Sequence, residues 1–158
     1  MSDTTSIVIV GVGGQGVLKA SQVLSDALVR KGYDVKQSEV HGMAQRGGSV
    51  VSEVRFGRQV HSPLAPERSA DYVVALDGRE GLRNAYRLRD GAGAINVPPE
   101  LQEQLGDPRA RNMAALGRLS PCLAVEPELW REAIRHCMPP RSVEMNLAAF
   151  EAGRAFRE

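Results

Sequence analysis

The chain has 158 residues, of which 42% are hydrophobic and 25% are charged, proportions typical of a single globular domain. Twenty basic and nineteen acidic side chains leave a net charge of +1, and only 4% of the residues are aromatic, so neither charge nor composition favours nucleic-acid binding. The two cysteines, Cys122 and Cys137, form no CxxC motif and no histidine stands at metal-ligand spacing, so we expect neither an iron–sulfur cluster nor a zinc site in this chain.

The N-terminus shows no targeting signal. Residues 1–5 contain no basic segment, and the apolar run after them is too short for a signal peptide or a membrane span. We therefore expect a cytoplasmic protein without membrane contact.

A glycine-rich loop follows the first apolar run. The sequence IVIV at 7–10 predicts a buried parallel strand, and GVGGQGV at 11–17 lets the chain turn into a helix whose first amides stay exposed, as in phosphate-binding loops. The alternative is that these glycines only permit close packing of strand against helix. The candidate cofactor contacts in this loop are Gly11, Gly13, Gly14, Gln15 and Gly16.

The next segment predicts a helix and a second strand. Apolar positions over residues 17–30 form one helical stripe, and Gly32 stands where a left-handed C-cap is expected. A short strand then begins at Tyr33 and ends near residues 37–39. In dinucleotide-binding domains an acidic residue at the end of this strand bonds the ribose, and Glu39 is the candidate, although it lies beyond the usual spacing of about 20 residues.

The loop SEVHGMAQRGGS at 38–49 is the second candidate site. It is polar, contains three glycines and precedes the alternating run at 50–56, and a loop this long inside a compact domain is usually functional or an interface. His41 supplies an acid–base group, Arg46 a bidentate cation, and Gln45 an amide beside Glu39, which together suit an anionic cofactor or a neighbouring subunit. A solvated loop held by the same hydrogen bonds is the alternative.

The remaining chain predicts two more strands and then helices. Residues 70–77 predict a buried strand, followed by a helix of about ten residues to Arg89 and a fourth core strand over 91–97 that Pro98-Pro99 ends. Asp77 and Arg79 follow a core strand, where ligands of open α/β sheets collect, so they are weaker site candidates. His61 is predicted to be a turn residue.

Three helices are predicted in the C-terminal third. They cover residues 110–119, residues 126–138 with Pro127 in the first turn, and a last helix that Ser142 can cap; His136 reads as a helix-surface residue. With no repeat or linker, the pattern predicts one domain over 1–158. Its class is α/β, a Rossmann-like open sheet with flanking helices and a helical C-terminal end.

Several motifs together resemble a known family. They are GVGGQG at 11–16, KQSEVHGMAQRGGSV at 36–50, VRFG at 54–57, RNM with LG at 111–117, and EMNL with AF and a glycine at 144–153. The chain resembles the gamma subunit or domain of thiamine-dependent 2-oxoacid:acceptor oxidoreductases, and especially the small subunit of indolepyruvate:ferredoxin oxidoreductase and similar subunits for aromatic 2-oxoacids. The resemblance spans nearly the whole chain, but between Val97 and Asp107 this chain is shorter than such relatives, so a sheet edge is expected to be missing there.

The resemblance implies an oxidative decarboxylation carried out by a complex. Thiamine diphosphate attacks the 2-oxoacid, carbon dioxide leaves, electrons pass through iron–sulfur clusters to ferredoxin or another acceptor such as NAD, and coenzyme A usually takes the acyl group. Thiamine diphosphate, Mg²⁺ and the clusters then belong to other subunits. The gamma unit packs against the thiamine-binding subunits and, in related enzymes, helps enclose coenzyme A.

On this basis the loop at 38–49 is predicted to be a subunit interface, with coenzyme A contact included, and no residue of this chain is expected to be catalytic. The isolated chain is then inactive. The alternative is a free-standing NAD(P)- or flavin-binding oxidoreductase built on the glycine loop, which the lack of a second domain to hold a substrate disfavours.

Overall fold

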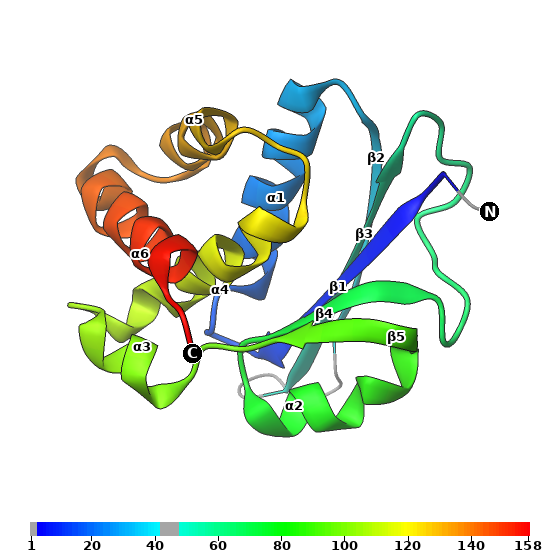
Figure 1. Ribbon diagram of the computed structural model, residues 1–158, viewed down its shortest axis with the longest axis horizontal. Helices are drawn as coiled ribbons and strands as arrows, with labels where there is room; N and C mark the ends of the chain where they lie inside the picture. The colour runs from blue at the N-terminus through cyan, green and yellow to red at the C-terminus, as the bar shows by residue number, and fades with distance from the viewer. Residues whose placement is uncertain (1–2, 42–47) are drawn as a thin grey trace.

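A computed structural model describes residues 3–41 and 48–158, and its centre is one five-stranded sheet (Figure 1). The strands are β1 (Thr5–Val12), β2 (Asp34–His41), β3 (Ser49–Gly57), β4 (Ala70–Ala75) and β5 (Leu88–Ile95). Their order is β2-β3-β1-β4-β5. The central strand β1 runs parallel to β4 but antiparallel to β3, which in turn pairs antiparallel with β2. The predicted Rossmann-like open sheet is confirmed, and it is a mixed sheet.

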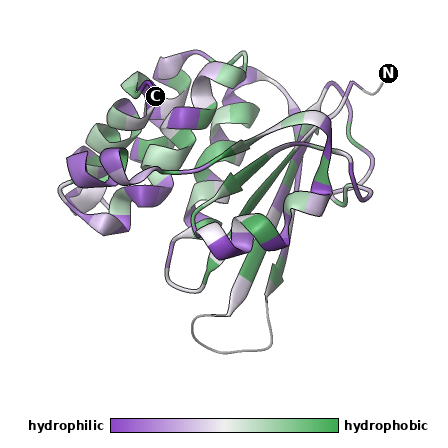
Figure 2. Cartoon of the chain, turned by 60° about the horizontal axis from the view of Figure 1, so that its bottom comes forward, coloured by the Kyte–Doolittle hydropathy of each residue, from purple (hydrophilic) through white to green (hydrophobic). Residues whose placement is uncertain are grey.

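Helices flank the sheet on both sides. They are α1 (Val17–Lys31), α2 (Gly78–Arg83), α3 (Pro99–Gln104), α4 (Arg111–Leu119), α5 (Pro127–Cys137) and α6 (Val143–Ala155). Figure 1 shows α1, α4, α5 and α6 together on one side of the sheet, with α2 near the other. Figure 2 shows hydrophobic residues concentrated on the strands between them. In the described ranges 3–41 and 48–158, no helix is long and apolar enough to cross a bilayer.

Helix α1 packs against the sheet through the predicted apolar stripe. Its buried residues include Val17, Ala20, Leu24 and Leu28, which lie on one face of a 3.6-residue period. Gly32 ends the helix in the left-handed conformation with φ of 105°, and its amide donates to carbonyls of the last turn. The predicted stripe and C-cap are therefore confirmed.

The opposite face of the sheet is covered without a long helix. Val8, Val10 and Val51 form a small apolar cluster there. Beside it the buried carboxylate of Glu53 accepts hydrogen bonds from Arg87 Nη1 at 2.7 Å and from the amide of Ala65 at 2.9 Å. A buried charge needs such partners, so this pair fixes the segment after β3 against the sheet.

The region between β4 and α4 differs from the predictions. The expected ten-residue helix is only the six residues of α2 and a 3₁₀ turn at Ala85–Arg87, and β5 already begins at Leu88. This strand is mostly exposed because it forms the sheet edge, so the prediction of a fourth core strand is wrong in its burial. Helix α3 was not predicted, although Pro99 occupies the first-turn position that proline favours.

The last two predicted helices are present, with one change at a cap. Pro127 lies in the first turn of α5 as predicted. Ser142 stands at the N-cap of α6, but its hydroxyl donates to the Pro139 carbonyl at 3.1 Å and makes no cap hydrogen bond. The preceding 3₁₀ turn at Pro140–Ser142 orients the residue away from the helix amides.

Helices α4 and α6 approach each other through two glycines. A Cβ at Gly117 would lie 2.1 Å from the Phe150 carbonyl oxygen, and one at Gly153 would lie 2.0 Å from the Ala114 carbonyl oxygen. Real Cβ atoms do not come so close to backbone atoms. The crossing therefore requires glycine on both helices, and both glycines stand in the segments at 111–117 and 144–153 that carry the family resemblance.

We expect Gly153→Ala to lower the free energy of unfolding by at least about 1 kcal/mol, because the added methyl forces the helices apart despite the better helix propensity of alanine. Urea unfolding followed by circular dichroism measures the change. The matched control is Gly106→Ala, where the methyl meets no described atom within 4 Å and should change stability by less than about 0.5 kcal/mol. Equal effects of the two substitutions would contradict this account of the crossing.

Candidate functional site

The glycine loop leaves β1 and turns directly into α1. Gln15 closes the turn, since its side-chain Oε1 accepts the Val12 amide at 2.8 Å and its own amide donates to the Val12 carbonyl at 3.1 Å. A Cβ at Gly11 would lie 2.8 Å from both Gln15 Oε1 and Val17 Cγ2. Gly11 is thus required by packing inside the turn.

Gly16 is required by packing against α4. It has a φ of 83° and stands at the N-cap of α1, and its carbonyl accepts a hydrogen bond from Asn112 Nδ2 at 3.1 Å. A Cβ here would lie 2.4 Å from that same nitrogen. For Gly11 and Gly16 the close-packing interpretation therefore holds.

Gly14 is different, because it faces open space. Its φ is 92°, and apart from Gly14 itself and its two chain neighbours, no atom of the described residues lies within 4 Å of the position a Cβ would take. It lines a groove of about 460 Å³ together with the first turn of α1, including Val17 and Lys19. That turn has no acidic residue and no side-chain cap within the described chain, so its amides and positive dipole end are directed at the groove. This is the geometry expected of an anion site.

A basic rim borders the loop, and the sequence analysis missed it. Lys19 lines the groove, and its Nζ donates to the Cys137 carbonyl at 3.2 Å. Arg109 and Arg111 line an adjoining hollow of about 230 Å³ that also reaches Gly14. Lys19 was the one local signal of this basic rim in the sequence. A cation in the first turn of a helix opposes the helix dipole and is normally avoided, so its presence there is unusual. The arginines come near the loop only through the tertiary fold.

Charges on the rim are partly balanced. Hydrogen bonds from the Arg109 side chain, and then from its backbone amide, lower the pKa of Asp107, so this carboxylate is ionised and pairs with the guanidinium. Arg111 Nη2 donates to Gln102 Oε1 at 2.8 Å, whereas its buried Nε has no hydrogen-bond partner in the described parts of the chain. The rim is therefore positive but moderate in strength.

The second predicted site begins and ends at the same end of the strands as the glycine loop. Val12 pairs with Ser49, and His41 pairs with Val50, so β2 and β3 join beside the end of β1. The Gly13 amide donates to the Gly48 carbonyl at 2.9 Å and ties the two segments together. The structure thus places the described end of the second predicted site, Gly48 and Ser49, beside the glycine loop. Gln45 and Arg46 lie outside the described residues, and of His41 only the backbone is described.

The strand order disfavours the ribose role considered for Glu39. Glu39 pairs with Ser52 of β3, and Ser52 pairs with Ile9 of β1, so Glu39 lies two strands away from β1 and level with a residue before the loop. Two strand spacings amount to about 10 Å. In a dinucleotide-binding sheet the second strand lies next to the first. Contact of Glu39 with a partner or cofactor remains a prediction.

Among the weaker candidates, Asp77 has a structural role. Asp77 is the N-cap of α2, where its Oδ1 accepts the amides of Arg79 at 2.9 Å and Glu80 at 3.1 Å. His61 is an exposed residue of the segment after β3. His136 is exposed on α5 as predicted, but its Nδ1 lies 2.7 Å from Asp26 Oδ2, a partner distant in sequence.

Comparisons with known proteins agree with this arrangement. The family model for pyruvate ferredoxin/flavodoxin oxidoreductase matches residues 6–156. The chain belongs to this family.

Among curated relatives, the indolepyruvate oxidoreductase subunit IorB of Thermococcus kodakarensis is 33% identical, over 94% of this chain and 93% of the relative. The 2-oxoglutarate synthase subunit KorC of Archaeoglobus fulgidus is also 33% identical, over 97% of this chain and 88% of the relative. The resemblance stated from the motifs is therefore confirmed.

Solved structures share the fold. The gamma subunit of a keto/oxoacid ferredoxin oxidoreductase from Geobacter sulfurreducens superposes with a TM-score of 0.79 at 24% identity, covering 94% of this chain and 95% of that chain. A 2-oxoglutarate:ferredoxin oxidoreductase from Magnetococcus marinus, with 2-oxoglutarate, coenzyme A and succinyl-CoA bound, superposes with a TM-score of 0.85 at 19% identity, covering 98% of this chain but 31% of that chain. The fold thus occurs both as a small subunit and as part of a longer chain.

The alignment with the Thermococcus relative spans 188 positions, more than the 158 residues of this chain, so that relative contains segments that this chain lacks. A shortened segment between Val97 and Asp107 stays a prediction, since the alignment length does not give its position. In the structure α3 occupies part of that stretch, directly after the edge strand β5.

We expect Gly16→Ala to lower the free energy of unfolding by about 2–3 kcal/mol, the sum of left-handed strain and the displaced Asn112 hydrogen bond. In an Asn112→Ala background the same change should cost only the strain, about 1–2 kcal/mol. Gly14→Ala is the matched control with strain alone. Urea unfolding of the four variants measures this coupling, and additive effects at Gly16 and Asn112 would contradict it.

Proposed function

We propose that this chain is the accessory gamma-type subunit of a multi-subunit 2-oxoacid:acceptor oxidoreductase. The observation that carries the proposal is the near end-to-end match to small subunits of such enzymes, 93% of IorB from Thermococcus and 88% of KorC from Archaeoglobus. The complex oxidatively decarboxylates a 2-oxoacid, usually to the acyl-CoA. An aromatic substrate such as indolepyruvate or phenylglyoxylate is favoured because the IorB relatives act in an indolepyruvate oxidoreductase.

The redox centres fit the partner subunits and not this chain. A four-cysteine iron–sulfur cluster needs more thiolates than the two cysteines present, Cys122 and Cys137. In this proposal, partner subunits hold the clusters and the thiamine diphosphate with its Mg²⁺, and pass electrons to ferredoxin or NAD. This chain contributes no catalytic residue and supplies a shaped surface.

We assign that surface to the C-terminal end of the central strand β1, where the glycine loop lies beside the start of β3. Gly14 presents open backbone, α1 presents its uncapped first turn, and Lys19 and Arg109 add positive charge, all of which suit the phosphates of coenzyme A. When bound, coenzyme A supplies the thiol that accepts the acyl group. The adjoining segment with His41, Gln45 and Arg46 is then the contact with the thiamine-binding subunits.

A free-standing nicotinamide enzyme is the poorer interpretation. The antiparallel strand β3 separates β1 from β2, so the acidic residue that would hold an adenosine ribose is displaced from the glycine loop. Lys19 and Arg109 remain suited to phosphate without any ribose contact. Phosphate recognition alone does not make a dinucleotide site.

The isolated chain should show no turnover of indolepyruvate in a viologen-reduction assay with added thiamine diphosphate, Mg²⁺ and coenzyme A, because the redox centres are held elsewhere. Co-expressed with its partner subunits, it should elute in one complex with iron–sulfur absorption and activity. Turnover by the chain alone, or NADH binding at micromolar concentration measured by calorimetry, would contradict the proposal and favour the nicotinamide enzyme.

Gly14→Val should lower assembly or raise the KM for coenzyme A at least about tenfold, because a side chain would fill the open space at the loop. Gly32→Val is a matched control: its φ is 105°, its Cβ position is also open, and it lies at the opposite end of α1. Both variants carry similar backbone strain, so any difference between them reports on the loop. Equal KM values and equal assembly by size-exclusion chromatography would show that the loop meets neither ligand nor partner.

A further inference from the structure

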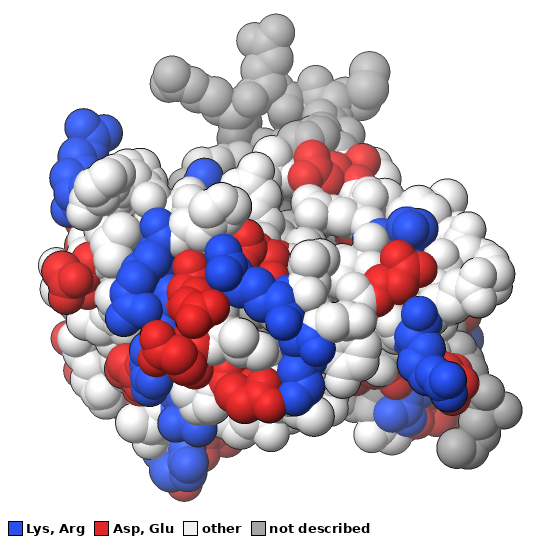
Figure 3. All heavy atoms as spheres, turned by 90° about the horizontal axis from the view of Figure 1, so that it is seen from above, with Lys and Arg blue, Asp and Glu red and all other residues white. Residues whose placement is uncertain are grey.

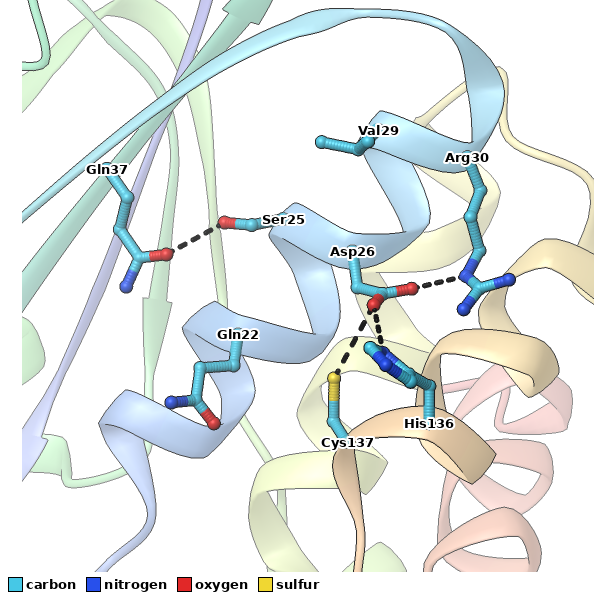
Figure 4. Close-up of a pocket in the computed structure, with 8 residues that line it drawn as sticks. All are labelled: Gln22, Ser25, Asp26, Val29, Arg30, Gln37, His136 and Cys137. Carbon is cyan, nitrogen blue, oxygen red and sulfur yellow. Dashed lines mark hydrogen bonds and ion pairs between the residues drawn. The ribbon is translucent and has the colours of Figure 1, made fainter.

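Three side chains that could bind a metal ion meet where the C-terminal half of α1 packs against the end of α5 (Figure 4). Asp26 comes from α1, and His136 and Cys137 end α5. Asp26 Oδ2 lies 2.7 Å from His136 Nδ1 and 3.9 Å from Cys137 Sγ, and the ligand atoms of all three lie within 4.8 Å of one another. Figure 4 shows the imidazole and the thiol both directed at the carboxylate.

We propose that Asp26, His136 and Cys137 bind a divalent transition-metal cation of the Zn²⁺ type. This departs from the expectation of no zinc site, which considered only spacing along the sequence, whereas Asp26 joins the other two residues through the fold. Carboxylate oxygen, imidazole nitrogen and thiolate sulfur are the three ligand types that Zn²⁺ takes in proteins. With zinc bonds of about 2.0–2.3 Å, neighbouring ligands of a tetrahedral site lie roughly 3.3–3.8 Å apart. The observed separations bracket this range, so shifts of an ångström or less in side-chain position complete the site.

The surrounding residues orient the ligands. Arg30 Nε bonds Asp26 Oδ1 and leaves Oδ2 to face the imidazole and the thiol. Side chains that orient a metal ligand by hydrogen bonding are usual at metal sites. Lys19 binds the Cys137 carbonyl, so its charge lies near the cluster as well. Burial, and then the Asp26 carboxylate, raise the pKa of the Cys137 thiol, so a cation must displace the thiol proton when it binds. The carboxylate and the resulting thiolate would then offset the charge of a divalent cation beside these two basic side chains.

The site has an open position. The three ligands line one side of a cavity of about 490 Å³, whose other walls include Gln22, Ser25 and Gln37. Ser25 Oγ donates to Gln37 Oε1 at 3.0 Å, so these two groups already have partners, and the cavity has space for a water or another exchangeable fourth ligand. Three protein ligands with one open coordination position form an exchangeable site, unlike the closed four-ligand sites of structural zinc.

A bound cation would fasten α1 to α5. Ion pairs already join α1 to this helix and its N-cap: Arg30 pairs with Glu132 of α5 at 3.3 Å, and Lys31 pairs with the N-cap residue Glu126. Exposed pairs of this kind contribute little individually. A metal held by both helices would add a constraint that increases with metal concentration.

The test is titration of the purified full chain with Co²⁺, which reports thiolate ligation through a sulfur-to-cobalt charge-transfer absorption. We expect a one-to-one complex with this absorption, displaced by Zn²⁺, and a rise in melting temperature with Zn²⁺. Cys137→Ser should abolish the absorption, and Asp26→Asn and His136→Ala should each weaken binding by more than the roughly 10–100-fold typical of residues that only orient a ligand. Cys122→Ser, at the other cysteine, is the matched control and should bind like the wild type.

Two outcomes would overturn the proposal. One is Co²⁺ binding without the thiolate absorption, which would mean that Cys137 is not a ligand. The other is Co²⁺ binding by the wild type that is no tighter than that of Cys137→Ser, in which case the cluster is only an ion-pair contact between α1 and α5. Circular dichroism of each variant shows that it is folded, and the readout is independent of assembly with partner subunits.

Discussion

The antiparallel pairing of β3 with β1 is the constraint on which the site depends. Strand β3 begins opposite Val12, at the end of β1 where the glycine loop lies, and it runs back along β1 to Thr5. The connection from β2 therefore ends beside that loop, and the hydrogen bond from the Gly13 amide to the Gly48 carbonyl joins the two. The same pairing moves β2 one strand further from β1. One topological choice thus brings the start of β3 beside the glycine loop and moves Glu39 away from the usual position of the ribose contact.

Helices α4 and α6 hold the glycine loop in place. Asn112 of α4 donates to the Gly16 carbonyl, and α4 is itself packed closely on α6 through Gly117 and Gly153. Three close contacts therefore position the loop, and each of them has a glycine on one side because a side chain would not fit. These glycines are Gly16, Gly117 and Gly153. Rigid support of this kind suits a surface that must match a partner or a cofactor, because loosely held backbone loses affinity through ordering.

Charge is distributed without a dominant sign. Figure 3 shows basic and acidic side chains interleaved over the face seen from above. Several of the ion pairs join α1 to α5 and its N-cap, including Lys31 with Glu126. Such a surface lacks the single-sign field that attracts polyanions. Recognition in this protein then rests on local geometry, at the glycine loop and at the cavity beside Asp26, where a few groups converge.

The sequence by itself determined the features that depend on neighbours along the chain. The strand–loop–helix unit, the apolar stripe of α1, the cap at Gly32 and the family motifs all follow from local pattern, because backbone conformation and helical period act over a few residues. Only the tertiary structure decided the exposure of β5, the antiparallel place of β3, the basic rim with Arg109, and the meeting of Asp26 with His136. These depend on contacts between distant segments, and local spacing carries no information about them.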